Sequence, residues 1–154
     1  LCTEPYPAAS AAMNLMLGSL LATLYRFAAA VAPGAVERRM FLRILQDKAR
    51  HVAYGMGHVR YHLAHQPRQR EPLAGSLDAL EHCLAGILGS PELAGALTVY
   101  AGGGAAADEL AAGRERVARF LELAVSEYLA RRRRLGLESP SSRLRAIIQG
   151  VVAA

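Results

Sequence analysis

The feature that most constrains the fold is an unbroken run of residues between two proline-containing breaks. The run begins after Pro33–Gly34 and continues to Gln66, where Pro67 stops it. Its apolar residues recur in steps of three and four, which predicts one amphipathic helix of about 45–50 Å. Lys48 lies on the predicted apolar face, which we expect to be buried and which comprises Phe41, Leu45, Lys48, Val52, Met56, Val59 and Leu63.

The rest of the sequence predicts further helices separated by short turns. We expect helices over about 8–32, 77–88, 91–101, 106–135 and 143–152, with a polar turn at "HQPRQREPLAGS" and a helix break at Gly102–Gly104. Ser90 followed by Pro91 is typical of a helix N-terminus. No strand pattern is present, so the predicted class is all-α. We expect one domain, with a long helical hairpin over 1–66 and a C-terminal helical extension over 67–154 packed on it.

The first predicted helix is long enough to suggest a membrane span. Against a span stand Asn14, Ser19, Thr23 and Arg26, and an alanine-rich composition with little large apolar bulk. We therefore expect the central helix of a soluble bundle rather than a membrane helix. Two cysteines make no disulfide framework and no secretory signal is evident, so we expect a cytoplasmic protein. The formal charge of +5 permits an acidic partner without requiring one.

One short motif lies in the middle of the long second helix. It reads Asp47-Lys48-Ala49-Arg50-His51 and is followed by "VAYGMGHVRYHL". The stretch resembles the ferritin-like superfamily, specifically the bacterial di-iron carboxylate proteins whose fourth bundle helix carries a D-E-x-R-H motif. The downstream "GGG" and "GRERVARFLELAVSEYLARRRRLGL" are similar to C-terminal regions attached to such domains. The resemblance covers roughly the whole chain, but its chemically specific part is these five residues.

The resemblance implies a ferritin-like bundle of di-iron oxidase or oxygenase lineage, with iron as cofactor. A glutamate and a histidine spaced i, i+3 on one helix can both reach a metal inside a bundle. His51 would then be a metal ligand, and Asp47 would accept a hydrogen bond from a ligand histidine on another helix. Tyr25 and Tyr54 are candidates for lining the bundle cavity, although tyrosines at such positions also simply pack.

This sequence departs from the family pattern at two ligand positions. Lys48 replaces the glutamate of the motif, and Asn14 stands where the preceding helix would supply another glutamate. We therefore expect no stoichiometric iron in this chain, because the two changes remove negative charge where a cation needs it. Two interpretations of Lys48 stay open: its ammonium substitutes for a metal beside carboxylates, or it extends from the edge of the apolar face into solvent.

The recognisable hairpin matches only the second half of a ferritin-like bundle. We therefore expect another helical segment, either a missing N-terminal half or another subunit in a homo-oligomer. The first functional hypothesis is a di-iron oxidoreductase lineage with a degenerate or incomplete metal site, its present activity left open. The alternative is a metal-free scaffold that oligomerises through the hairpin face.

Two further features carry weaker hypotheses. Arg131–Arg134 could bind nucleic acid or a membrane surface, but a solvated turn that complements the helix dipole is the simpler interpretation. His58 and His62, at i, i+4, could bind zinc, but no Cys or Glu accompanies them. We therefore expect no nucleic-acid partner and a surface or helix-end role for these histidines.

Overall fold

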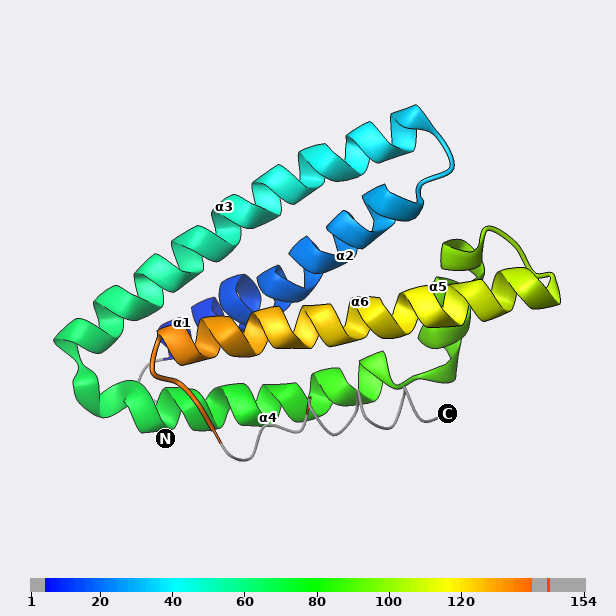
Figure 1. Ribbon diagram of the computed structural model, residues 1–154. Helices are drawn as coiled ribbons and strands as arrows, with labels where there is room; N and C mark the ends of the chain where they lie inside the picture. Colours follow the sequence, from blue (N-terminus) through cyan, green and yellow to red (C-terminus); the bar gives the residue numbers. More distant parts are fainter. Residues whose placement is uncertain (1–4, 140–143, 145–154) are drawn as a thin grey trace.

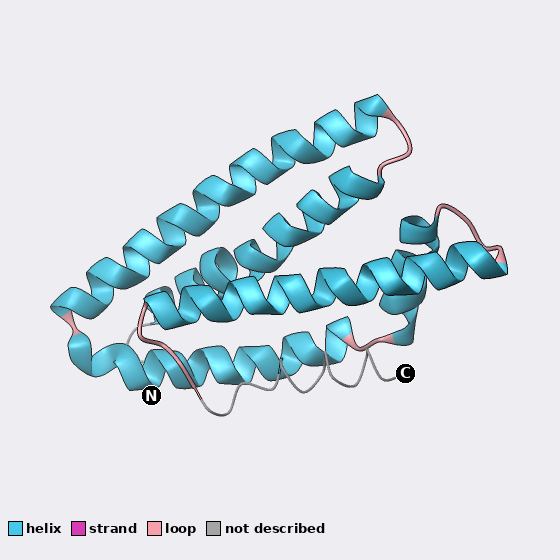
Figure 2. Cartoon of the chain, in the orientation of Figure 1, coloured by secondary structure: helices cyan, strands magenta, loops and turns pink. Residues whose placement is uncertain are grey.

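The computed structural model describes residues 5–139 and Leu144, and these residues form helices and connecting loops without a strand (Figures 1 and 2). The expected all-α class is confirmed. The elements are α1 (Pro5–Ser10), the π-helix η1 (Ala11–Leu17), α2 (Gly18–Val31), α3 (Ala35–His65), the 3-10 helix η2 (Pro67–Gln69), α4 (Arg70–Leu88), α5 (Pro91–Gly102) and α6 (Ala107–Arg134).

Helix boundaries follow the sequence signals closely, with one exception. Ser90 caps α5, because its Oγ accepts a hydrogen bond from the Leu93 N–H at 3.3 Å, and Pro91 takes the first helical position. The exception is α4, which begins at Arg70 instead of 77, so the polar turn expected there is wrong. Pro72 is compatible with helix because it lies in the first turn, where no intrahelical N–H is required. The helix expected over 143–152 lies outside the described residues, apart from the buried Leu144.

Glycines allow the connection and close packing of α5 and α6. Gly103 has a φ of +89°, a left-handed conformation that lets the chain leave α5. The Glu109 carboxylate accepts a hydrogen bond from the Ala106 N–H at 2.9 Å at the start of α6. A Cβ at Gly113 would overlap with the carbonyl oxygen of Thr98, so glycine is needed where the two helices meet.

The central element of the bundle is the continuous stretch α1–η1–α2. It packs against α3 on one side, and α2 also packs against α6, which forms a hairpin with α5 (Figure 1). The core draws fully buried side chains from each part of the chain, among them Leu15, Val59, Leu77, Tyr128 and Leu137. Their burial supplies the main driving force for the arrangement.

The α3 helix is a peripheral element of 31 residues. Its buried residues are Val52, Gly55, Val59 and Leu63, all in its C-terminal half. Residues 35–51 include no buried side chain, and Phe41, Leu45 and Lys48 are only half-buried. The expected burial of the whole apolar face is therefore wrong for this half, because α2 alone covers that side of α3 there.

The apolar N-terminal stretch meets the length and hydropathy requirements for a membrane span. Within the described residues it is Tyr6–Val31, and half of its most apolar window is buried inside the protein. The segments Pro67–Leu88 and Pro91–Gly102 meet the same requirements only as a pair, with a 62° bend between them. Core helices and signal sequences share these properties, so length and composition alone do not identify a membrane segment.

Candidate functional site

The motif residues of α3 lie on its exposed half. The side chain of His51 is exposed, as is that of Asp47, whose Oδ1 accepts a hydrogen bond from Arg50 Nη1 at 2.7 Å. Lys48 is half-buried, and among the described residues it has no hydrogen-bond or ion-pair partner. Asp47 is thus paired with Arg50 of the same helix, while the ammonium of Lys48 is available to a carboxylate of a partner.

Asn14 lies in the π-helix η1, where that segment crosses α3. Its Nδ2 donates a hydrogen bond to Ser10 Oγ at 3.3 Å. A Cβ at Gly55 would overlap with the Cβ of Asn14, which places the two residues in direct contact. Asn14 therefore lies against the turn of α3 that follows His51.

The two cavity candidates lie in different surroundings. Tyr25 is half-buried, and its ring is 6.3 Å from that of Phe41 across the α2–α3 hairpin. Tyr54 is 60% exposed, and its ring lies 6.1 Å from that of His58. The His58 ring also meets the edge of Tyr6 at 5.2 Å. Tyr25 packs inside the hairpin, whereas Tyr54 lies on the surface.

The donor set of this part of the chain does not fit iron. Within residues 5–139 and Leu144, no three His, Cys, Asp or Glu side chains converge on a common point. Asn14 provides a neutral amide that is turned toward Ser10, and Lys48 provides a cation. These residues therefore do not provide a set of ligands for iron.

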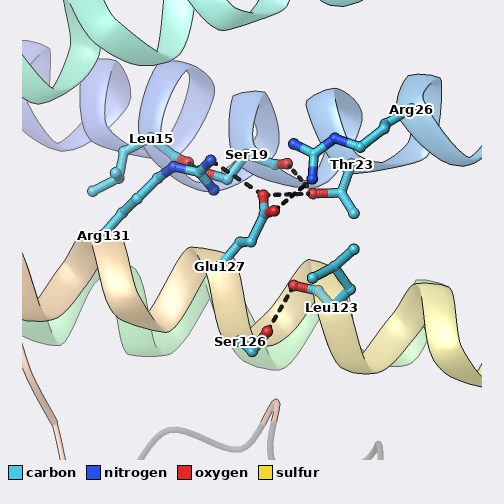
Figure 3. Close-up of polar contacts among 8 residues, drawn as sticks. All are labelled: Leu15, Ser19, Thr23, Arg26, Leu123, Ser126, Glu127 and Arg131. Carbon is cyan, nitrogen blue, oxygen red and sulfur yellow. Dashed lines mark hydrogen bonds and ion pairs between the residues drawn. The ribbon is translucent and has the colours of Figure 1, made fainter.

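A carboxylate between α2 and α6 joins the two helices, and Figure 3 shows its contacts. Glu127 Oε1 accepts from Arg26 Nη1 at 2.6 Å, and Oε2 accepts from Thr23 Oγ1 at 3.1 Å and from Arg131 Nη2 at 3.2 Å. Burial alone would raise the pKa of Glu127, but Arg26, followed by Arg131 and Thr23, lowers it below its ordinary value. In the sequence, Thr23 and Arg26 stand out only as polar interruptions of an apolar helix.

Arg132 forms a second polar cluster, and its position corrects the expectation of a solvated arginine turn. Its side chain is 1% exposed, and Nη1 donates to Glu81 and, at 2.8 Å, to Asp78. Burial alone would lower the pKa of Arg132, but the hydrogen bond to Asp78 and the charge of Glu81 raise it. The spacing from Tyr128 to Arg132 continues the buried face of α6, a signal that the run of four arginines obscured. Arg133 and Arg134 are exposed as expected.

The N-terminal half of α3 presents an apolar surface that α2 covers only in part. We name it the α3 stripe and define it as Val36, Met40, Phe41, Ile44, Leu45 and Lys48. Helical spacing places these residues within about half of the helix circumference. Val36 is 79% exposed and Met40 50% exposed, so large apolar side chains reach solvent here.

Comparison with protein-family models, with curated proteins and with solved structures finds no match to this chain.

Proposed function

We propose that this chain is a helical interaction module that binds an amphipathic, carboxylate-bearing helix along the α3 stripe. The observation that carries the proposal is the absence of any buried side chain in residues 35–51, although Val36, Met40, Phe41, Ile44 and Leu45 lie on one side of the helix. The patch is only partly covered by α2, with Val36 and Met40 exposed, and an apolar patch that reaches solvent in this way is typical of an interaction surface. A partner helix would bury it by inserting apolar residues at helical spacing.

Charge favours an acidic partner over a second copy of the same surface. Residues 35–51 carry the basic side chains Arg38, Arg39, Arg43, Lys48 and Arg50 against the acidic Glu37 and Asp47. Pairing this surface with itself about a two-fold axis would bring like charges together. A carboxylate on the partner would meet Lys48, which has no ion pair among the described residues and lies within the apolar stripe.

A ferritin-like origin of the scaffold is part of the same proposal. The quoted motif supports it, as does the long α2–α3 hairpin. Under this proposal the chain belongs to a di-iron oxidase lineage in sequence and uses the hairpin for assembly in place of metal chemistry.

The test is binding of a synthetic amphipathic helix that carries a leucine stripe flanked by glutamates, measured by fluorescence anisotropy on the full chain. A peptide with lysines in place of the glutamates is the matched probe. We expect the acidic peptide to bind and the basic one to bind at least about tenfold more weakly. Lys48→Glu should weaken binding of the acidic peptide by about tenfold, because it replaces an attraction with a repulsion.

Arg50→Glu is the matched control, since it makes the same charge change two residues away, outside the α3 stripe. We expect it to change the affinity by less than about twofold, as a screened surface charge does. Equal losses of affinity in both variants would show that only the net charge matters, and would contradict a defined site. A stable homodimer in sedimentation that Met40→Asp dissociates would show self-association in place of an acidic partner.

A further inference from the structure

A second surface lies between α2 and α6, away from α3. It is a pocket of about 620 Å³ whose lining includes Arg26, Phe27, Arg116, Arg119, Phe120 and Leu123. Its volume falls within the range of about 300–1,000 Å³ that is usual for small-molecule sites. We propose that this pocket binds a single-chain amphiphile with an anionic head group, a carboxylate or a phosphate, with the hydrocarbon chain on the aromatic floor and the head group among the arginines.

The floor of the pocket is apolar and preformed. The rings of Phe27 and Phe120 stack with centroids 5.0 Å apart and an interplanar angle of 24°, which joins α2 to α6 in the pocket lining, with Phe120 only 7% exposed. Leu123 is 44% exposed at the same site and extends this surface along α6. A hydrocarbon chain that lies on this floor would bury its own apolar surface and that of the pocket.

The guanidinium groups leave a positive charge around the floor. Arg116 Nη1 donates to the carbonyl oxygen of Ala101 at 2.6 Å, and among the described residues its charge meets no carboxylate. Glu127 is shared between Arg26 and Arg131, so one negative charge faces two positive ones. Arg119 pairs with Glu115, its one ion-pair partner in the part of the chain that the structure describes, and both side chains are largely exposed.

These arginines retain donors for a ligand. A guanidinium has five N–H donors in a planar fork, and each pocket arginine donates to one partner among the described residues. The fork matches the two oxygens of a carboxylate. A ligand with an anionic head group and an apolar chain would therefore match both the arginines and the apolar floor of the pocket.

The experiment is calorimetric titration of the full chain with octanoate, octanol, octyl phosphate and propionate. We expect saturable binding of octanoate and of octyl phosphate, binding of octanol weaker by about tenfold or more, and none detectable for propionate, because octanol lacks the charge and propionate lacks the apolar chain. Octanol binding as tightly as octanoate would overturn the role of the arginines. The ratio of the octanoate and octyl phosphate affinities shows which of the two head groups the site prefers, and failure of both to bind would overturn the proposal.

Variants locate the binding. Arg119→Gln, which breaks only an exposed ion pair, and Arg116→Gln should each weaken octanoate binding by about tenfold. Leu123→Gln should weaken octanoate binding severalfold, because it removes apolar contact with the hydrocarbon chain and leaves the arginines in place. Arg114→Gln is the control, since Arg114 lies two residues before Arg116 and points to another side of α6. An equal loss in Arg114→Gln, or no loss in Arg119→Gln and Leu123→Gln, would overturn the pocket as the binding site.

Discussion

Asn14 and Gly55 touch where the π-helix η1 crosses α3, so closely that a Cβ at Gly55 would overlap with the Cβ of Asn14. This contact joins the N-terminal stretch to the C-terminal half of α3, which is the half that the bundle buries. The N-terminal half of α3 extends beyond this contact and carries the α3 stripe. The Asn14–Gly55 crossing therefore anchors the surface that we propose as the interaction site.

The crossing predicts opposite effects for two glycine substitutions in α3. Gly55→Ala should destabilise the fold by about 1–3 kcal/mol, because the added methyl group must displace Asn14 or its backbone. Gly57→Ala should stabilise it by up to about 1 kcal/mol, since nothing lies within 4 Å of the added Cβ and alanine favours helix. Urea unfolding followed by circular dichroism measures both. Equal effects would contradict the close contact.

The buried Arg132 cluster predicts a large loss of stability when its cation is removed. Arg132→Met should cost about 3–5 kcal/mol, because it leaves the carboxylate of Glu81 in a buried position without its guanidinium partner. Arg133→Met is the control, since Arg133 and its partner Glu138 are both exposed, and it should cost less than about 0.5 kcal/mol. Thermal and urea unfolding of both variants gives the comparison. Similar losses in the two would contradict the burial of Arg132.

The lowered pKa of Glu127 predicts an acid-dependent part of the stability. Because the folded-state pKa lies below the ordinary value of 4.5, folding is stabilised when Glu127 is ionised, above that value. This contribution should disappear as the pH falls from about 4.5 through the folded-state pKa. The free energy of unfolding of Glu127→Gln should therefore fall less steeply than that of the wild type over this range. Parallel pH profiles would show that the ion pairs with Arg26 and Arg131 do not stabilise the fold.

Metal analysis tests the altered ligand positions directly. After anaerobic loading with ferrous iron and removal of unbound metal, we expect no stoichiometric iron in the wild-type chain or in Lys48→Glu. The single glutamate would join an exposed His51 and an Asp47 already paired with Arg50, which is too few converging ligands. Two irons per wild-type chain would contradict this prediction. Uptake by Lys48→Glu alone would identify Lys48 as the substitute for a former metal.

Local sequence signals determined much of the helical order. Pro33–Gly34 and Pro67 bound α3, and Ser90 with Pro91 begins α5, because capping and proline effects act within one turn of the chain. The start of α4 was predicted too late for a local reason as well, since its first turns are mostly polar and contain Pro72, although Leu73 and Leu77 already follow helical spacing. These helix ends depend on residues that are close together in sequence, so the sequence alone was sufficient to locate them or to explain the error at the start of α4.

The tertiary structure decided which of those helical faces meet a partner. Periodicity placed Lys48 and Val52 on the same face of α3, but only Val52 is buried, because α1 and η1 add to the contact with α2 only along the C-terminal half of that helix. The same holds for Arg132, which lies in a run of four arginines and becomes buried because Glu81 and Asp78 of α4 pair with it. Amphipathic spacing defines a face within one helix, whereas burial and ion pairing depend on contacts between helices that are distant in sequence.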